Sequence, residues 1–238
     1  LLQNHITNGA KKVILSVPPE DESIKTIVVG VNNSIINSED FIISNASCTT
    51  NNAAPMLQVI NDLCGIEQAY ITTVHSYTTD QSLHDQPHRD LRRARAANQS
   101  IVPTTTGAAK AVAKALPELK GLLTGNAIRV PTPNVSMAIM NLNLKKATDK
   151  DGLNDYLRKI SLKSDLQNQV DYTASNEIVS TDLVGSRYAG VVDSQATIVD
   201  GDRAVLYVWY DNEFGYSCQV VRVMLEMAGI TVPTLPAK

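Results

Sequence analysis

Two residues whose side chains form reactive pairs in enzymes, a cysteine and a histidine, each follow a predicted strand. Cys48 comes after a short apolar run and opens a segment whose apolar residues have helical spacing. This position places its sulfur beside unpaired backbone N–H groups at the positive end of a helix dipole, which lowers the pKa of a thiol. His75 ends another predicted strand. If the fold brings the two together, they form an activated nucleophile; the alternatives are a small core residue and a hydrogen-bonded polar residue.

A second group of residues is suited to holding an anion. Three threonines and a glycine precede an Ala-rich segment with helical spacing, namely Thr104, Thr105, Thr106 and Gly107. Hydroxyl and N–H groups that converge at a helix N-terminus bind anions. Arg129, on a predicted strand, adds a guanidinium that can form a bidentate phosphate contact. The alternatives are ordinary helix capping by the threonines and a surface ion pair for Arg129.

Two further segments carry polar or charged side chains of interest. In residues 209–216, the amide of Asn212 at a strand end beside aromatic residues is suited to a flat polar ring. The alternative is a strand-to-helix corner in which Asp211 or Asn212 acts as a cap. Residues 89–95 are basic, but a solvated or oligomer-facing loop is favoured over a nucleic-acid site because the chain as a whole is acidic.

The composition sets limits on the class of protein. The chain has 238 residues, a net charge of −3, 43% hydrophobic residues and three cysteines. These values predict one large or two small domains with a substantial core. The odd, small number of cysteines argues against a disulfide framework and favours a reducing compartment. We find neither a signal-peptide pattern nor an apolar run long enough to span a membrane, and we predict a cytoplasmic protein.

The N-terminal quarter of the chain reads as strands without their helices. Residues 13–17, 26–31 and 41–43 are short apolar or β-branched runs typical of a parallel sheet. They predict the tail end of a larger α/β unit. A helix follows from Cys48 to Gly65, with Pro55 expected to kink or shorten it and Cys64 expected to be a buried core thiol.

The remainder of the chain predicts an antiparallel α+β domain, because strands come in runs and do not alternate with helices. The long polar stretch 78–102 is predicted to be a functional loop. Helices are predicted at residues 106–116, 152–160 and 217–227. Strands are predicted at residues 69–77, 127–130, 135–144, 178–183, 195–199 and 204–210.

Six segments of the chain together resemble the phosphorylating glyceraldehyde-3-phosphate dehydrogenases. Residues 44–51 read Ser-Asn-Ala-Ser-Cys-Thr-Thr-Asn, which is similar to the family's active-site signature. The other matching segments, in the family's order and spacing, are residues 75–78, 90–97, 105–110, 129–135 and 209–213. The resemblance covers nearly the whole chain and favours the functional interpretation of Cys48, His75, Thr106 and Arg129 over the alternatives.

The resemblance implies a two-step oxidation and phosphorylation. Cys48 attacks the aldehyde carbon of glyceraldehyde 3-phosphate and forms a thiohemiacetal, and His75 acts as general base while a hydride leaves for the nicotinamide. The resulting thioester is attacked by inorganic phosphate to give 1,3-bisphosphoglycerate. The residues implied to hold the substrate's phosphate are Thr78, Asp80 and Arg129. Those implied to hold the attacking phosphate are Ser47, Thr49, Thr106 and Gly107, with Arg129 able to serve both.

The implied cofactor is NAD or NADP, and no metal is implied. By resemblance, Asn212 hydrogen-bonds the nicotinamide carboxamide and Tyr216 packs against the ring. The chain contains no G-x-G, however, and the family's glycine fingerprint would precede Leu1. We therefore expect residues 1–47 to be remnant strands of an NAD-binding Rossmann domain, 48–212 the catalytic domain, and 213–238 a helix that packs on the first part. We also expect this chain alone to bind NAD weakly and to show little dehydrogenase activity.

The resemblance also implies partners, and it leaves alternatives. The loop 78–102 matches the family's loop that lines a neighbouring subunit's cofactor pocket, which implies a homotetramer. An erythrose-4-phosphate dehydrogenase is a close alternative, although Thr105, Thr106 and Gly107 favour the phosphorylating triose enzyme. A non-catalytic fragment that oligomerises or binds a partner is an alternative from another class. No membrane and no nucleic-acid role is expected.

Overall fold

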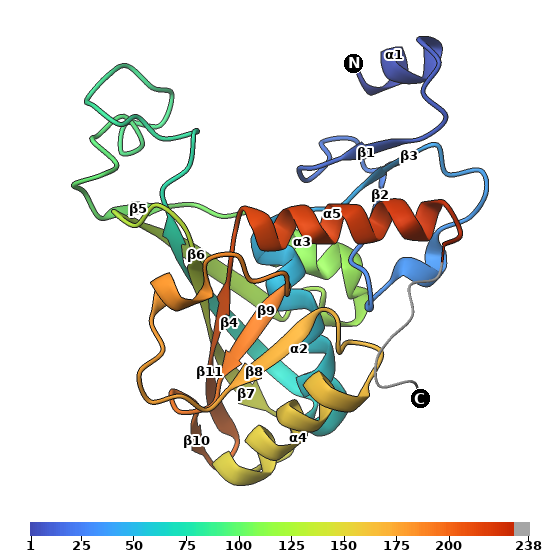
Figure 1. The fold of residues 1–238 in the computed structure, drawn as a ribbon. Helices are drawn as coiled ribbons and strands as arrows, with labels where there is room; N and C mark the ends of the chain where they lie inside the picture. The colour runs from blue at the N-terminus through green and yellow to red at the C-terminus, as the bar shows by residue number, and fades with distance from the viewer. Residues whose placement is uncertain (231–238) are drawn as a thin grey trace.

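A mixed sheet forms the body of the molecule in the computed structural model, which describes residues 1–230. Its eight strands lie in the order β5-β6-β4-β7-β11-β9-β8, and β10 pairs with β11 (Figure 1). The β4–β6 and β8–β9 pairs are parallel and the other pairs are antiparallel. The strands are β4 (Ile66–Ser76), β5 (Val102–Thr104), β6 (Leu123–Val130), β7 (Ser136–Leu144), β8 (Val170–Thr173), β9 (Gly190–Asp193), β10 (Ile198–Asp200) and β11 (Arg203–Tyr210). The predicted α+β class is confirmed.

Three helices cover one face of this sheet, and they are α2 (Cys48–Cys64), α3 (Ala108–Ala115) and α4 (Lys150–Lys163). Alternate residues of the strands, such as Met140 and Leu206, pack under α2 around Leu57, and all three are fully buried. This burial follows from the two-residue period of strands and the helical spacing of apolar residues in α2. The core therefore lies between α2 and the sheet and fixes the direction in which α2 points.

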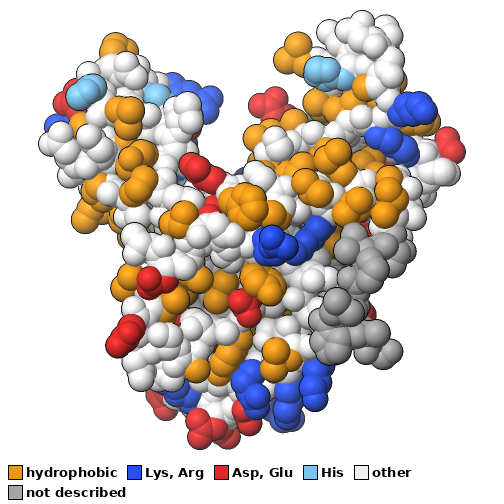
Figure 2. Space-filling view, viewed as in Figure 1, with side chains coloured by type: hydrophobic (Ala, Val, Ile, Leu, Met, Phe, Trp, Pro, Cys, Tyr) orange, Lys and Arg blue, Asp and Glu red, His pale blue; other side chains and the backbone are white. Residues whose placement is uncertain are grey.

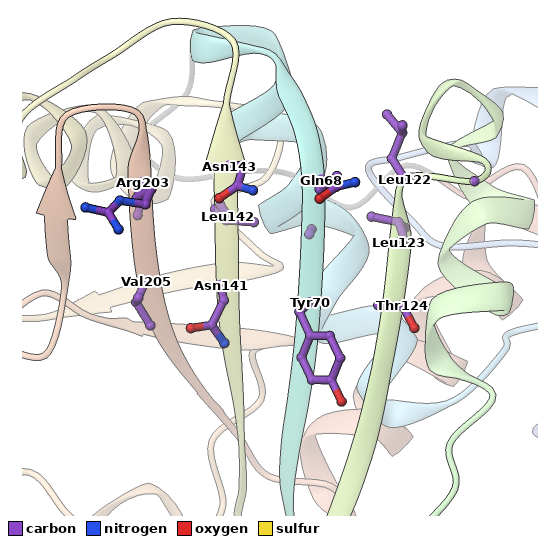
Figure 3. Close-up of a pocket in the computed structure, with 13 residues that line it drawn as sticks. Gln68, Tyr70, Leu122, Leu123, Thr124, Asn141, Leu142, Asn143, Arg203 and Val205 are labelled. Carbon is purple, nitrogen blue, oxygen red and sulfur yellow. The ribbon is translucent and has the colours of Figure 1, made fainter.

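The other face of the sheet carries none of the helices of residues 1–230. Tyr70 of β4 is 44% exposed on this face. A groove of about 460 Å³ lies there, over β6, β4, β7 and β11. Figure 3 shows its lining residues, among them Gln68, Tyr70 and Asn141. This groove lies toward the start of β4, whereas His75 lies near the strand's other end.

A small parallel sheet precedes α2 and has the order β1-β3-β2. Its strands are β1 (Val13–Leu15), β2 (Lys25–Thr26) and β3 (Ile42–Ser44), preceded by α1 (Leu2–Thr7) and interrupted by the 3-10 helix η1 (Asn33–Ile35). The last described helix, α5 (Phe214–Met227), lies beside this sheet (Figure 1). Its Val223 is packed in one apolar cluster with Ile27, Val29 and Ile43.

Several sequence-based predictions of elements were wrong. Residues 26–31 are a strand only up to Thr26; the apolar residues that follow are buried without pairing as a strand. Residues 178–183 were predicted to be a strand but contain the 3-10 helix η3 (Ser180–Leu183), where Asp182 accepts a hydrogen bond from the N–H of Val179 and turns the chain. The short strands β8 and β9 were not predicted. The segment 195–199 is a strand only from Ile198.

Pro55 does not shorten α2, which was one of the two outcomes predicted for it. The helix runs unbroken from Cys48 to Cys64 with Pro55 inside. A proline in a helix interior costs about 3 kcal/mol, but the residues beside it, Ala54, Met56 and Leu57, are fully buried. Full burial of one large apolar side chain contributes about 1.5–3 kcal/mol, so the packing around Pro55 offsets the lost hydrogen bond.

The predicted functional loop is a long segment without helix or strand, as expected. It runs from residue 77 to residue 101, before β5 begins. In Figure 1 it projects from the sheet at the opposite side of the molecule from α1. Figure 2 shows that a hollow separates this loop from the N-terminal part of the chain.

Candidate active site

Cys48 is the first residue of α2, as the sequence predicts. Ser47 is the N-cap, in extended conformation, and its Oγ accepts a hydrogen bond of 3.2 Å from the N–H of Thr50. Ala46, just before it, is fully buried and has a φ of 53°, a conformation that is unfavourable for a residue with a Cβ. The tight turn from β3 into α2 therefore holds the thiol at the helix N-terminus, half-buried and unpaired in any disulfide.

His75 lies directly opposite this thiol. Its Nε2 is 3.5 Å from the Sγ of Cys48, and its Nδ1 is 2.7 Å from the carbonyl oxygen of Ser76. If Nδ1 carries the proton and donates it to this carbonyl, then Nε2 has the free lone pair and faces the thiol. The ring is 5% exposed and meets the ring of Tyr210 edge-on at 6.0 Å. The structure thus brings together the two residues on which the sequence argument centred.

Arg129 completes the polar end of the sheet beside His75. Its position follows from the parallel pairing of β4 and β6, in which His75 and Arg129 are partners. Its Nη1 donates to the carbonyl of Ser76 at 3.0 Å and to Oγ1 of Thr78 at 3.3 Å, and lies 2.9 Å from Nδ1 of His75. Its buried Nε has no hydrogen-bond partner among the described residues. Arg129 is therefore not a surface ion pair, and its guanidinium is held beside His75 by Ser76 and Thr78.

The electrostatics of the pair correct one expectation. Burial, followed by the positive charge of Arg129, lowers the pKa of His75 to about 4, so its imidazole is neutral near neutral pH. Burial raises the pKa of the Cys48 thiol, and a hydrogen bond from Thr49 and the charge of Arg129 lower it by less. The predicted net lowering of the thiol pKa is thus wrong for this structure. The resting pair is a neutral thiol facing a neutral imidazole that can accept its proton.

The hydroxyls of Ser47 and Thr49 point to protein partners. Ser47 Oγ lies 2.8 Å from Oγ1 of Thr50, and Thr49 Oγ1 lies 2.8 Å from the phenol oxygen of Tyr210. Tyr210 is 2% exposed, and burial raises its pKa far above the usual range. Its phenol is therefore neutral and holds the first turn of α2 against β11.

Thr106 and Gly107 lie at the start of α3. Oγ1 of Thr106 accepts a hydrogen bond of 3.2 Å from the N–H of Ala108, so this hydroxyl caps the helix. Gly107 is exposed, and a Cβ added to it would meet no atom within 4 Å. Within residues 1–230 no hydrogen bond joins either residue to Cys48 or His75.

Asp80 is paired with a residue that the sequence analysis did not single out. Its carboxylate forms an ion pair with Arg93, while His88 Nε2 is 3.8 Å away. Arg93 also donates from Nε to Oγ1 of Thr104 at 3.1 Å. Its positive charge lowers the pKa of both His75 and Arg129, which places a second guanidinium near the pair. The basic run 89–95 was the only signal, and a loop without periodicity does not show which arginine points inward.

Asn212 and Tyr216 lie where β11 passes into α5. Asn212 is 7% exposed, and its Oδ1 accepts a hydrogen bond of 2.8 Å from the hydroxyl of Ser136. The phenol of Tyr216 donates to the carbonyl of Ala46 at 3.3 Å, which ties α5 to the turn before Cys48. Asp211 accepts from the N–H groups of residues 213 and 214 and caps α5, so the capping alternative applies to Asp211 and not to Asn212.

Two other kinds of site, a membrane span and a metal centre, have no counterpart in the described residues. No helix within residues 1–230 combines the length and the apolar character needed to cross a membrane. Nor do three or more His, Cys, Asp or Glu side chains of that part of the chain gather in a way that could hold a metal ion.

What the geometry defines is a site for thiol chemistry on an anionic substrate: a helix-terminal cysteine, a neutral histidine and two arginines. Comparisons agree with this class. A family model described as "Glyceraldehyde 3-phosphate dehydrogenase, C-terminal domain" matches residues 47–212. The chain is 59% identical to a glyceraldehyde-3-phosphate dehydrogenase-like protein of Pseudomonas aeruginosa, over 96% of this chain and 49% of that protein.

Two further relatives are named without qualification as glyceraldehyde-3-phosphate dehydrogenases. That of Borreliella burgdorferi is 52% identical over 92% of this chain and 65% of its own length. Glyceraldehyde-3-phosphate dehydrogenase 2 of Bacillus subtilis is 47% identical over 94% of this chain and 66% of its own length. The chain belongs to the glyceraldehyde-3-phosphate dehydrogenase family, and it spans between about half and two thirds of the length of these relatives.

Proposed function

We propose that this chain carries the catalytic machinery of a phosphorylating glyceraldehyde-3-phosphate dehydrogenase, which converts glyceraldehyde 3-phosphate and inorganic phosphate to 1,3-bisphosphoglycerate. The observation that carries the proposal is the 3.5 Å approach of Cys48 Sγ to His75 Nε2, with the guanidinium of Arg129 on the far side of the imidazole.

In the first half of the reaction, Cys48 is the nucleophile. Its sulfur bonds to the aldehyde carbon while its proton passes to Nε2 of His75 and then to the former carbonyl oxygen, which gives a thiohemiacetal on Cys48. His75 can take this proton because its lowered pKa keeps it neutral near neutral pH. His75 then removes the hydroxyl proton of the thiohemiacetal as the carbon is oxidised to a thioester. NAD or NADP, held by the residues discussed below, would supply the oxidant for this step by accepting the hydrogen of that carbon as a hydride.

In the second half, the thioester transfers its acyl group. An oxygen of inorganic phosphate bonds to the thioester carbon, the carbon–sulfur bond breaks, and the thiolate of Cys48 leaves. His75 returns its proton to the sulfur, and the product is an acyl phosphate. The positive charge of Arg129, which lowers the pKa of Cys48, stabilises the leaving thiolate.

Two phosphate groups must be held in this scheme. Residues proposed for the substrate's phosphate are Thr78, Asp80 and Arg129, and those for the attacking phosphate are Ser47, Thr49, Thr106 and Gly107. The position of Arg129 beside His75 and Thr78 supports its role. Asp80 is negative and acts through its ion pair with Arg93, which adds a second guanidinium for a phosphate. Guanidinium groups suit phosphate because they donate two hydrogen bonds in one plane.

The residues present fit a nicotinamide. Asn212 offers an amide whose Oδ1 is already bonded to Ser136, so Nδ2 is available for the carboxamide oxygen. Tyr216, whose hydroxyl is bonded to the carbonyl of Ala46, offers an aromatic ring in the first turn of α5. We propose that these two residues hold the nicotinamide of NAD or NADP, the choice between which depends on contacts to the adenosine.

We propose the same division of the chain as the resemblance implies, with 1–47 as remnant strands of the NAD-binding domain, 48–212 as the catalytic domain and 213–238 as a helix that packs on the first part. Residues 231–238 of the last range lie outside the described residues. The packing of Val223 against Ile27 and Ile43 supports it. We also propose a cytoplasmic homotetramer. Its support is the projecting loop, on which Leu83, Leu91 and Ile101 are exposed.

Erythrose 4-phosphate is the second candidate substrate, and it has weaker support because the relatives reported above bear the triose name. A purely non-catalytic role has to be separated from both by experiment.

The proposal is tested by the acyl-transfer half-reaction, which needs no cofactor. Acetyl phosphate supplied to the chain should acetylate Cys48, because its carbonyl carbon bonds to sulfur and inorganic phosphate leaves. We expect release of phosphate and an acetyl mass on the Cys48 peptide, both absent in Cys48→Ala and retained in Cys218→Ala. Acetylation of several cysteines at equal rates, or of none, would contradict the proposal and favour the non-catalytic alternative.

A further inference from the structure

Ser136 lies between the catalytic strand and the proposed cofactor amide. It begins β7, is 2% exposed, and pairs with Tyr210 of β11, two residues before Asn212. Its Oγ accepts a hydrogen bond of 3.1 Å from the N–H of Ser76, the residue after His75, and donates one of 2.8 Å to Oδ1 of Asn212. One hydroxyl therefore connects the end of β4 with the start of α5.

The direction of these hydrogen bonds follows from chemistry and fixes the orientation of the amide. The N–H of Ser76 can only donate, so Ser136 Oγ accepts from it and has its single proton left to give. The oxygen of the Asn212 amide, 2.8 Å away, accepts that proton, and the phenol of Tyr210 is a second polar neighbour of the same hydroxyl. The Nδ2 of Asn212 must then point the other way. Among residues 1–230 it has no hydrogen-bond partner, and it is not one of the fully buried unpaired atoms, so it keeps a small exposed surface in a residue that is 7% exposed.

The backbone before Ser136 is strained in support of this arrangement. Val135 is 3% exposed and has a φ of 66°, which is a clear outlier for a β-branched residue. Its N–H donates to Oδ1 of Asn134 at 2.7 Å, and its carbonyl accepts from the hydroxyl of Ser76 at 2.9 Å. Strain of this kind costs on the order of 1–3 kcal/mol and persists where the surroundings impose it, often at functional sites.

We propose that Ser136 is a positioning residue that fixes the side-chain amide of Asn212 with Nδ2 pointing away from Ser136 and available to the proposed cofactor. The amide then presents a donor and selects a carbonyl acceptor on the ligand, as a primary carboxamide provides. Without Ser136 the amide can turn over and present its oxygen, which repels the same carbonyl. This inference rests on the cofactor role proposed for Asn212.

The first measurement needs no ligand. Nuclear magnetic resonance of the chain, with asparagine labelled with nitrogen-15, reports the side-chain amide of Asn212, assigned with Asn212→Ala. Ser136→Ala should shift or broaden this signal. Ser161→Ala, which removes another buried hydroxyl bonded only to the carbonyl of Arg158 on α4, should leave it unchanged.

The second measurement titrates nicotinamide mononucleotide into the same variants. The dissociation constant should rise about tenfold in Asn212→Ala and about three- to tenfold in Ser136→Ala, since a net hydrogen bond contributes about 1 kcal/mol. Ser161→Ala should match the native chain. Ser136→Cys, a weaker donor of similar size, should lie between, and it serves if Ser136→Ala does not fold.

The outcomes separate the two claims. An unchanged Asn212 signal in Ser136→Ala, with a dissociation constant equal to that of Ser161→Ala, overturns the positioning role even if Asn212→Ala binds poorly. If Asn212→Ala binds the mononucleotide as well as the native chain, the proposed cofactor role fails. The amide signal then still decides whether Ser136 orients Asn212.

Discussion

Helix α2 has a cysteine at each end, and only one is placed for chemistry. Cys48 is the first residue and Cys64 the last. Both thiols have a pKa raised by burial. Cys48 nevertheless faces the imidazole of His75 and feels the charge of Arg129 at the positive end of the helix dipole. Cys64 lies at the negative end, 6% exposed in the apolar core. The two thiols share the residue type and the helix, and they differ in the side chains from the sheet that surround each sulfur. We expect these side chains to determine the difference in reactivity.

The largest expected difference is in alkylation. Near neutral pH, iodoacetamide should modify Cys48 faster than Cys218 and at least about a hundredfold faster than Cys64, because reaction at Cys64 requires local opening of the core. Mass-spectrometric mapping of each cysteine over time measures this. In the matched variant His75→Asn, the rate of modification should fall at Cys48 and stay unchanged at Cys218. Equal rates at the three cysteines in the native chain would show that the surroundings of Cys48 do not raise its reactivity.

The next largest effect is on stability in acid. Because the pKa of His75 is about 4 in the folded chain and about 6.5 when unfolded, the unfolded state binds a proton first as the pH falls. The stability that the neutral imidazole contributes is present above about pH 6.5 and is lost toward about pH 4. At about pH 4.5 the loss amounts to roughly 2–3 kcal/mol.

Urea unfolding of the native chain and of His75→Gln checks this value. The difference between about pH 7 and about pH 4.5 in the free energy of unfolding should shrink by that amount in the variant. His5→Gln, at the exposed N-terminal helix, is the control and should unfold like the native chain at both pH values. An equal acid sensitivity of His75→Gln and the native chain would mean that His75 is not held neutral.

A smaller effect, of the same sign on the pKa values of His75 and Cys48, is expected at Arg129. Its charge lowers the pKa of both His75 and Cys48. Arg129→Met should therefore raise both, which makes His75 protonate at higher pH and makes alkylation of Cys48 need higher pH. We expect shifts of about one pKa unit. Arg158→Met, at an exposed ion pair on α4, is the control.

These shifts can be followed separately. Proton resonances of His75 give its titration, and the pH dependence of iodoacetamide labelling gives that of Cys48. A shift of His75 alone would show that Arg129 acts on the imidazole but is too far from the sulfur to matter for it.

The sequence predicted the reactive end of α2 well, because local chemistry marks it. Ser47 before Cys48, an apolar helical period and Gly65 after Cys64 define both ends of the helix without any tertiary information. His75 could be placed at a strand end for the same reason. Their contact, and the sign of the net shift in the thiol pKa, depend on how deeply the sheet and helix bury them, which spacing does not report.

Other parts of the site and fold could not be predicted. Arg93 lies on a loop whose shape is set by its own ion pairs, and Ser136 looks like any small residue on a buried strand. The strand β9 is four residues long and is recognisable only because its neighbours pair with it. Side-chain hydrogen bonding likewise turned residues 180–183 into a 3-10 helix where an apolar pattern predicted a strand.

The smallest expected effect compares the caps at the two ends of α2. Ser47→Ala removes the acceptor of the Thr50 N–H and should lower the free energy of unfolding by about 1 kcal/mol. Gly65→Ala forces a Cβ onto a residue with a φ of 68°, 3.0 Å from Cδ of Lys145, at a cost of about 1–2 kcal/mol. Urea unfolding measures both.

The two substitutions should differ in their effect on the alkylation rate of Cys48, although they lower the free energy of unfolding by similar amounts. Ser47→Ala loosens the turn that holds the thiol against His75, so alkylation of Cys48 should slow about two- to fivefold, in line with loss of up to about 1 kcal/mol of local order. Gly65→Ala acts one helix length away and should leave that rate unchanged. If both variants slow Cys48 equally, reactivity follows the overall stability of α2 and not the local geometry of its first turn.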